Sequence, residues 1–255
     1  ANHDNQIMPT ANTSDISISF SPTSGSASLT PTNSAGQSAQ INVLATVGVK
    51  NSGGYSVYVK GSSQNLVGQK SSSNVIPGVS GSSTYANLPV NTWGYYAGAG
   101  TAIPENAAYK AVTTSGNGDK VAENTNTRID SDTKTIALSF AAKVNDQKPA
   151  DTYKNTITLS VVSSPKQVTF TDFTTTMQGM TSSICSQVSD GAEAQLRDTR
   201  DGKYYWVSKL ADGKCWMTQN LDLDLSTSKI LTPADSDVYD NWTPKHDTQV
   251  AVDAS

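Results

Sequence analysis

The chain has 255 residues, of which 36% are apolar and only 16% charged, and its formal net charge at pH 7 is −4. That length suffices for two ordinary domains, each with its own core. Hydroxyl and amide side chains take the place of Lys and Glu, which favours β-structure with many turns over long helices. The sequence has no cluster of Lys and Arg to follow a phosphate backbone, which argues against nucleic acid as a partner.

The sequence has no apolar stretch near the ~20 residues that a bilayer requires, so we expect no membrane span in this chain. Residues 1–14 are polar and do not form a positively charged start followed by an apolar segment. We expect them to be a disordered tail. Such a tail is typical of the exposed end of a matured secreted protein, and it is equally what a cut in a longer chain would produce.

Residues 15–164 alternate apolar and polar side chains, which predicts half-buried β-strands. Polar loops rich in Gly, Ser and Asn separate these strands. Seven or more strands of this kind bury their apolar faces most simply as two sheets packed face to face. We therefore predict an N-terminal antiparallel Ig-like β-sandwich over residues 15–164. The clearest strands begin near Ile16, Ile41, Tyr55, Ile136 and Ile157.

Three aromatic residues, Trp93, Tyr95 and Tyr96, lie beside glycines in the segment "LPVNTWGYYAGAG". They are either strand residues that fill the core of the sandwich, which we favour, or an exposed lip that binds a ligand. In the second interpretation these three side chains, together with Trp242, would stack on sugar rings.

The pattern changes after "SSPKQ", where we place the boundary to a second domain over residues 165–255. Apolar residues then recur at helical spacing, and Thr171 or Asp172 is available as the N-cap. This predicts an amphipathic helix with Cys185 beside its apolar stripe. The stripe consists of Phe173, Met177, Met180, Ile184 and Val188.

Beyond the helix, Tyr204 and Trp206 precede the turn "ADG", which predicts a β-hairpin with Cys215 just after the turn. A Cys185–Cys215 bridge would close a loop of about 30 residues, worth roughly 3–4 kcal/mol on the chain-entropy model. It would also indicate an oxidising, extracytoplasmic location, whereas the alternative is two reduced thiols. We expect the neighbouring aromatic side chains to supply the core of this small domain. They are Tyr204 or Tyr205, Trp206 and Trp216.

The segment "LRDTRDGKYYWVSKLADGKCWMTQNLDL" resembles the opening of the Fibrobacter succinogenes major paralogous domain. The usual form of that domain is Asp-x-Arg-Asp-Gly-x-x-Tyr, a short strand, a turn, a Trp-Met pair and Asn-Leu. The flanking "MQGMTSSIC" and "LTPADSD" are similar to the version in surface proteins of candidate phyla radiation bacteria, especially the Saccharibacteria. The resemblance covers about 65 residues of the chain. The matching positions are Asp198, Arg200, Asp201, Gly202, Tyr205, Trp216, Met217, Asn220 and Leu221.

This resemblance implies an extracytoplasmic domain whose fold is similar to C-type lectins and formylglycine-generating enzymes. Members of the family continue into an "RLPT…EW" segment that this sequence does not contain, so residues 165–255 would be the N-terminal part of such a domain. The fold class expected for the whole chain is therefore mainly β. An Ig-like β-sandwich would be followed by a small α+β disulfide-stapled domain with a partial C-type-lectin-like fold.

The sequence offers little material for catalysis, since its only histidines, His3 and His246, lie in polar terminal segments. We therefore expect no enzymatic activity and no cofactor other than an optional calcium ion. Acidic segments near the C-terminus either face water as turns and strand ends or supply oxygen ligands for calcium. The candidate calcium ligands are Asp222, Asp224, Asp235 and Asp237.

Two functions fit these features. The first is a non-enzymatic bacterial cell-surface or secreted protein with a structural or adhesive role. In it the sandwich is a stalk, and the second domain contacts a surface protein or glycan of a host or neighbouring cell. The second is a lectin-like carbohydrate-binding module, with calcium as an option. Both require a secreted β-scaffold that carries aromatic residues, and the sequence favours the first.

Overall fold

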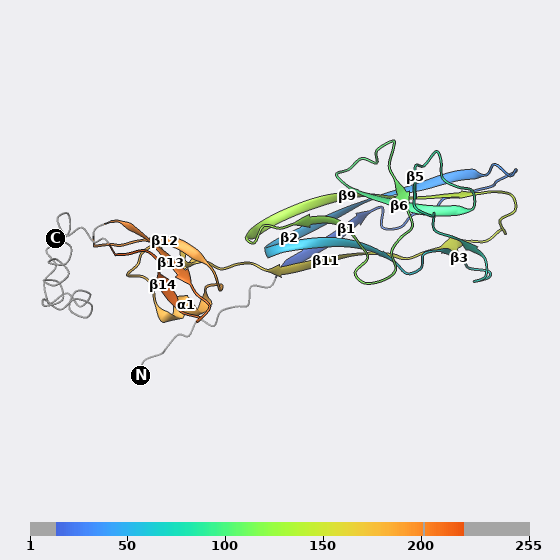
Figure 1. Cartoon of the computed structure of the whole chain (residues 1–255). Helices are drawn as coiled ribbons and strands as arrows, with labels where there is room; N and C mark the ends of the chain where they lie inside the picture. The colour runs from blue at the N-terminus through green and yellow to red at the C-terminus, as the bar shows by residue number, and fades with distance from the viewer. Residues whose placement is uncertain (1–13, 201, 222–255) are drawn as a thin grey trace, which may run out of the picture. The chain divides into compact units, whose positions relative to one another are not determined.

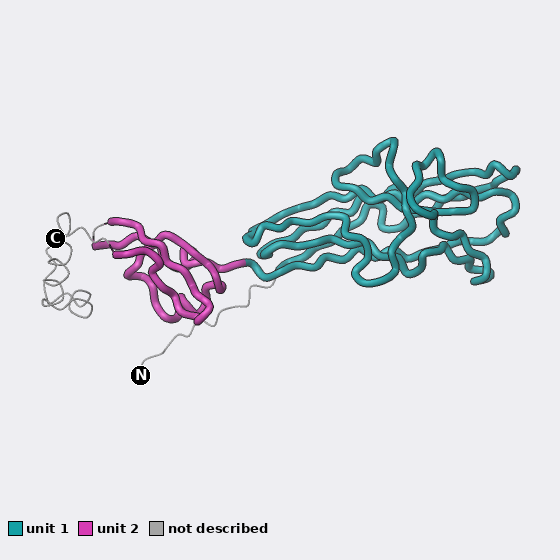
Figure 2. The backbone as a smooth tube through the Cα atoms, in the orientation of Figure 1, with its two compact units in different colours: residues 1–166 teal, residues 167–255 magenta. Residues whose placement is uncertain are grey.

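The computed structural model describes residues 14–200 and 202–221. The chain divides into two compact units, residues 1–166 and residues 167–255, which Figure 2 shows in different colours. The division follows Lys166, two residues beyond the boundary expected from the sequence. Of the expected N-terminal tail, only Ser14 belongs to the described residues.

Unit 1 consists of antiparallel β-strands, as the alternating sequence predicts (Figure 1). Its main sheet has the order β1-β2-β9-β6-β7-β5, with β8 and β11 also paired to β2, and a small sheet has the order β10-β3-β4. The strands are β1 (Asp15–Ser21), β2 (Gln37–Gly61), β3 (Leu66–Gly68), β4 (Val75–Ile76), β5 (Ser82–Ser83), β6 (Thr92–Ala99), β7 (Tyr109–Lys110), β8 (Asp119–Asn124), β9 (Ile129–Val144), β10 (Tyr153–Lys154) and β11 (Ile157–Pro165).

The long strand β2 changes partners halfway along its length. Residues 37–52 pair with β9 and, over part of that stretch, with β1, whereas residues 52–61 pair with β8 and β11. The change falls at Asn51 and Gly54, whose φ angles are 51° and 112°. Asn tolerates the left-handed region and Gly adopts it without steric cost, so these residue types permit the change of direction.

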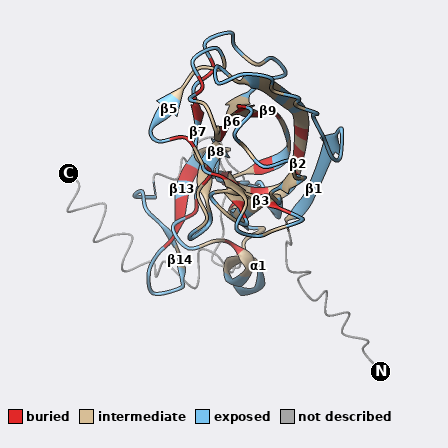
Figure 3. Ribbon diagram, turned by 90° about the vertical axis from the view of Figure 1, so that its right-hand side faces the viewer, coloured by how far each residue is buried: buried red, intermediate tan, exposed pale blue. Residues whose placement is uncertain are grey.

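Both halves of β2 contribute to one hydrophobic core, because their inward-facing valines belong to the same cluster. Figure 3 shows buried segments along β2 and β9. The two groups of strands that pair with β2 therefore share one interior. The largest fully buried side chains of this cluster are Val47, Val49, Val57, Val59, Trp93, Tyr95 and Ile136.

Strand β1 departs from the expected burial. Its apolar residues Ile16, Ile18 and Phe20 alternate with serines as predicted, yet they are 41%, 37% and 37% exposed. The strand lies at the edge of the main sheet and has β2 as its neighbour on one side. The alternation therefore predicted the strand correctly but not the burial of its apolar face.

A second apolar cluster lies on the face of the main sheet opposite to the core. Successive residues of a strand face opposite sides, so Ala141 of β9 points away from Ile136. It packs with Val79 and Leu88, from the loops between β4 and β6, and with Tyr109 of β7. A Cβ at Gly94 of β6 would meet Val79 and the Cβ of Tyr109, so glycine permits this close approach.

Unit 2 contains a three-stranded antiparallel sheet and two short helical segments (Figure 1). The hairpin expected around "ADG" is confirmed, since β13 and β14 pair across that turn. The elements are η1 (Phe170–Asp172), α1 (Ser182–Gln187), β12 (Glu193–Arg197), β13 (Tyr204–Lys209) and β14 (Cys215–Met217).

The prediction of one amphipathic helix from Phe173 to Val188 is wrong in its length. Within that stretch only α1, Ser182–Gln187, is α-helical. Thr174 Oγ1 accepts a hydrogen bond from its near neighbour Thr176 N at 3.1 Å, and Thr176 Oγ1 accepts one from Gly179 N at 3.1 Å. Such local bonds compete with helical ones, and Gly179 further disfavours a helix. The helix begins later, capped by Thr181, whose side chain accepts from Ile184 N.

The apolar residues of that stripe still reach the core of unit 2, although not from one helix. Val188 is buried, and Met177, Met180 and Ile184 pack against the same cluster. Phe173 is the exception, with 41% of its surface exposed. The hydrophobic pattern therefore identified most of the core-facing residues while predicting the wrong backbone.

We expect Ile136→Ala to lower the free energy of unfolding of unit 1 by about 2–5 kcal/mol, because it removes a fully buried side chain from a packed core. Ile18→Ala is the matched control, and we expect a change within about 1 kcal/mol because Ile18 is partly exposed. Urea unfolding followed by circular dichroism measures both. Equal effects of the two substitutions would contradict the assignment of β1 as an exposed edge.

Candidate functional site

The disulfide between Cys185 and Cys215 is confirmed, with an S–S distance of 2.05 Å and a Cα–Cα distance of 5.8 Å. It joins α1 to the first residue of β14. Cys215 packs against the buried cluster that includes Phe170, Leu196 and Val207. The bridge therefore closes a core too small to depend on hydrophobic burial alone.

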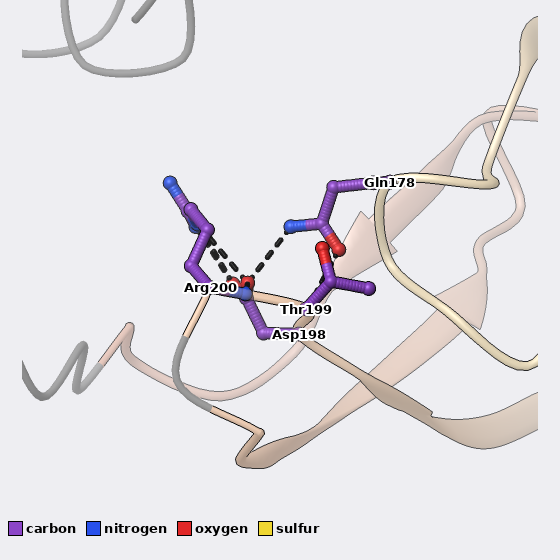
Figure 4. Close-up of polar contacts among 4 residues, drawn as sticks. All are labelled: Gln178, Asp198, Thr199 and Arg200. Atoms are coloured by element: carbon purple, nitrogen blue, oxygen red, sulfur yellow. Dashed lines mark hydrogen bonds and ion pairs between the residues drawn. The ribbon is translucent and has the colours of Figure 1, made fainter. Parts of the chain in front are cut away.

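The Asp198–Arg200 pair of the family-like motif forms a buried polar cluster at the end of β12 (Figure 4). Arg200 donates to both carboxylate oxygens, with Nη2 at 2.7 Å from Oδ2 and Nε at 3.0 Å from Oδ1. Gln178 Nε2 donates to Oδ1 at 2.8 Å, while Gln178 Oε1 accepts from Thr199 N at 2.9 Å. Asp198 thus ties the turn after β12 to the segment that precedes α1.

Burial by itself raises the pKa of the Asp198 carboxyl. The hydrogen bonds from Arg200 and Gln178 lower that pKa by more than burial raises it, so it lies below its ordinary value. The carboxylate is therefore ionised at neutral pH. Its side chain is 1% exposed and its oxygens are engaged by protein donors. We interpret this cluster as structural, because it has no exposed oxygen to offer a substrate or a metal ion.

The outward face of the sheet in unit 2 carries large aromatic side chains. Tyr204 and Trp206 alternate along β13 and are 55% and 44% exposed, and Trp216 of β14 is 49% exposed. In the sheet register Trp206 lies opposite Gln195, and Trp216 lies opposite Ser208. We call Tyr204, Trp206 and Trp216 the aromatic face. The expectation that Trp206 and Trp216 supply the core is wrong. Of the two tyrosines named as alternatives, Tyr205 is fully buried and Tyr204 is exposed.

Hydrogen bonds hold parts of the aromatic face in place. Trp216 Nε1 donates to Asp212 Oδ2 at 3.0 Å, which fixes the orientation of the indole ring. Thr218 N donates to the Trp206 carbonyl at 2.9 Å, which extends the pairing beyond β14. A positioned ring loses little conformational entropy on binding, so this face is suited to recognition.

The structure separates the three aromatic residues that the sequence grouped beside glycines. Trp93 and Tyr95 are buried in the main core, where Trp93 Nε1 donates to the Gln64 carbonyl at 2.8 Å and the Tyr95 hydroxyl donates to Asp119. They therefore cannot stack on a sugar ring. Tyr96 lies on the opposite face of β6, partly buried, and its ring centroid is 6.5 Å from that of Tyr109.

A cleft of about 550 Å³ lies in unit 1, beside the second apolar cluster. It is lined mainly by residues of β2, by Tyr109 of β7 and by residues of the loops before and after β6. Sequence reasoning missed it because residues from distant segments form it and none belongs to a motif. The lining side chains used below are Gln40, Asn42, Tyr85, Ile103, Glu105 and Tyr109.

The remaining candidate residues lie outside the described residues, so the structure does not place them. They are Trp242 and the four expected calcium ligands, Asp222, Asp224, Asp235 and Asp237. Within residues 14–200 and 202–221, no group of three or more His, Cys, Asp or Glu side chains gathers as metal ligands would. In the same part of the chain, no helix has the length and apolar character to cross a membrane.

Comparison with known proteins places the chain in no family. No protein-family model matches it, and neither a curated protein nor a solved structure is significantly similar.

We expect Asp198→Asn to lower the stability of unit 2 by about 2 kcal/mol, because it weakens charge-assisted hydrogen bonds in a buried site. The folded-state pKa is depressed, so the contribution of Asp198 is complete above its unfolded pKa of about 3.9 and is lost as pH falls through the folded pKa. The stability difference between wild type and variant should therefore shrink below about pH 4. Amide hydrogen exchange of residues 192–209 measures it.

Asp190→Asn is the control, since the Asp190 side chain is 81% exposed beside Lys209. We expect it to leave exchange in β12 and β13 nearly unchanged. A difference between wild type and Asp198→Asn that persists unchanged at pH 2 would contradict the assignment of an ionised, hydrogen-bonded Asp198.

Proposed function

We propose that this chain is a non-enzymatic structural or adhesive protein that acts at the cell surface or outside the cell. Unit 1 would be a β-rich spacer with an Ig-like sandwich arrangement, and unit 2 would be the recognition unit. The observation that carries the proposal is the construction of unit 2. A disulfide and a small core support a sheet whose other face presents Tyr204, Trp206 and Trp216 to solvent.

The chemistry of the aromatic face favours a protein partner. Trp and Tyr are the side chains that contribute most often to binding energy at protein interfaces, and Arg is the third. Arg197 lies opposite Tyr204 in the register, on the same face of the sheet. A sheet face with two Trp, one Tyr and one Arg is suited to the surface of a protein on a neighbouring cell.

The location outside the cytoplasm is supported by the disulfide, because cytoplasmic reductants keep thiols reduced. The partial C-type-lectin-like fold for residues 165–255 is a further part of the proposal. It is supported by the resemblance of the sequence motif, whose residues have structural roles in this chain. Asp198 and Arg200 form the polar turn, Tyr205 is buried, and Trp216 and Met217 belong to β14.

We expect the purified, non-reduced chain to have an intact mass 2 Da below that of its reduced form, because two thiol hydrogens are lost in the bridge. Reduction should destabilise unit 2 by roughly 3–4 kcal/mol, as expected for a closed loop of about 30 residues. The double variant Cys185→Ser, Cys215→Ser is the control, and reductant should not change its stability. Two thiols that react with an alkylating agent in the non-reduced chain would remove the support for an extracytoplasmic location.

We expect the double variant Trp206→Ala, Trp216→Ala to lose at least tenfold in affinity for cells that bind the fluorescently labelled wild type. The reason is that a few large aromatic side chains carry most of the binding energy at an interface, and truncation removes it. Flow cytometry against a panel of bacterial and host cells measures the binding. Protease treatment of the target cells should remove it, whereas glycosidase treatment should not.

Phe173→Ala is the matched control. Phe173 is also an exposed aromatic residue of unit 2, but it directly follows η1 and does not belong to the sheet. It should retain wild-type binding. Binding by the double variant at wild-type strength, or no binding of the wild type to any cell in the panel, would overturn the adhesive role of the aromatic face.

A further inference from the structure

The cleft in unit 1 combines a fixed aromatic wall with oriented polar groups. Gln40 and Asn42 of β2 have the opposite parity to Val47 and Val49, so they lie on the face of the sheet away from the main core. The volume of the cleft, about 550 Å³, lies within the usual range for small-molecule sites. Loops on either side of β6 complete its walls.

A directional chain of hydrogen bonds leads to the cleft. The hydroxyl oxygens of Tyr109 and Ser139 are 2.8 Å apart, and Ser139 Oγ donates to Asn42 Oδ1 at 2.6 Å. Because the single hydroxyl hydrogen of Ser139 goes to Asn42, the Tyr109 hydroxyl must be the donor in the first bond. The chain therefore runs from Tyr109 through Ser139 to Asn42.

This chain determines what Asn42 offers to a ligand. The Asn42 Oδ1 atom is held by Ser139, and its Nδ2 atom has no hydrogen-bond partner within the described part of the chain. Ser139 and Tyr109 are 0% and 1% exposed, so the hydrogen bonds that hold Asn42 Oδ1 are shielded from water. Each bond in such a chain polarises the next, which strengthens Nδ2 as a donor. Asn42 is thus a preorganised hydrogen-bond donor at the floor of the cleft.

The walls supply an apolar surface and an acceptor. The ring centroids of Tyr85 and Tyr109 are 6.4 Å apart, and Ile103 packs against the same cluster. Tyr85 is only partly buried, so part of its ring faces the cleft that it lines. Glu105 and Gln40 add a carboxylate and an amide.

The charge of the cleft selects among ligand classes. None of the described residues that line it is Lys, Arg or His, and Glu105 is the one carboxylate among them. An anionic ligand would have no cation to pair with and would meet Glu105. A purely apolar ligand would bury Asn42 Nδ2 and the Glu105 carboxylate without partners, which is costly. A neutral molecule with hydroxyl groups and an apolar face meets both demands.

We propose that the cleft of unit 1 binds a neutral saccharide. The apolar face of a sugar ring packs on Tyr85 and Ile103, Asn42 Nδ2 donates to a ring hydroxyl, and Glu105 and Gln40 accept from further hydroxyls. This site is built from unit 1 alone. It is independent of the aromatic face of unit 2, so either site can fail without the other.

The test is saturation-transfer NMR of the whole chain with a panel of oligosaccharides at millimolar concentration. The neutral members are oligomers of glucose, galactose, mannose and N-acetylglucosamine, and the charged members are sialylated and sulfated. We expect at least one neutral oligosaccharide to bind and the charged members not to bind. Asn42→Asp keeps the acceptor for Ser139 but removes the Nδ2 donor, so it should weaken binding about tenfold.

Tyr85→Ala should weaken the same binding by about tenfold through loss of the ring surface, and Tyr204→Ala is its matched control on the aromatic face of unit 2. Circular dichroism establishes that each variant is folded; if Tyr85→Ala is not, Asn42→Asp alone decides the test. Absence of binding by every neutral oligosaccharide overturns the proposal. So does binding of charged members only, or a loss caused by Tyr204→Ala but not by Asn42→Asp.

Discussion

The arrangement of unit 1 depends on the change of partners in β2. A straight strand in a sheet has two neighbours, whereas β2 pairs with β9 and, in part, β1 over residues 37–52 and with β8 and β11 over residues 52–61. The valines of both halves meet in one core, so the two groups of strands are held together by the chain itself and by shared burial. The outward face of the first half, with Gln40 and Asn42, then becomes available to form the floor of the cleft.

Unit 2 is governed by a different constraint, which is the small number of residues available to cover its sheet. A three-stranded sheet has two faces, and η1, α1 and the segment between them cover one. The disulfide and the Asp198 cluster hold that covering segment in place, at α1 and at Gln178 respectively. On the other face, Tyr204, Trp206 and Trp216 stay exposed at positions where an ordinary solvent-facing strand would carry polar side chains. An exposed patch of this kind is typical of an interaction surface.

Sequence patterns predicted the elements whose signal is local. Period-two alternation identified the long strands, "ADG" identified the β13–β14 turn, and the two cysteines identified the bridge. The patterns failed where tertiary context decides. The spacing from Phe173 to Val188 is helical, but Thr174, Thr176 and Gly179 bond locally and break the helix. Tyr204 and Tyr205 are chemically identical neighbours, and only the sheet determines which of them is buried.

The cleft shows why a site of this kind escapes sequence reasoning. Asn42 and Ser139 are ordinary strand residues 97 positions apart, and Tyr109 belongs to a two-residue strand. Their relation comes from the register that places Asn42 opposite Ser139, and from β7, which brings the Tyr109 hydroxyl within hydrogen-bonding distance of Ser139. Small residues at neighbouring positions let β7 approach β6 and β9 closely. They are Ala137 and Ala141 on β9 and Gly94 on β6.

Aromatic residues serve two purposes in this chain: in unit 1 a buried tyrosine orients a polar group, and in unit 2 exposed rings are themselves the surface. The first arrangement suits a ligand recognised by its hydroxyl pattern, because the direction of a hydrogen bond is specified, and the second suits a partner recognised by the area that it covers.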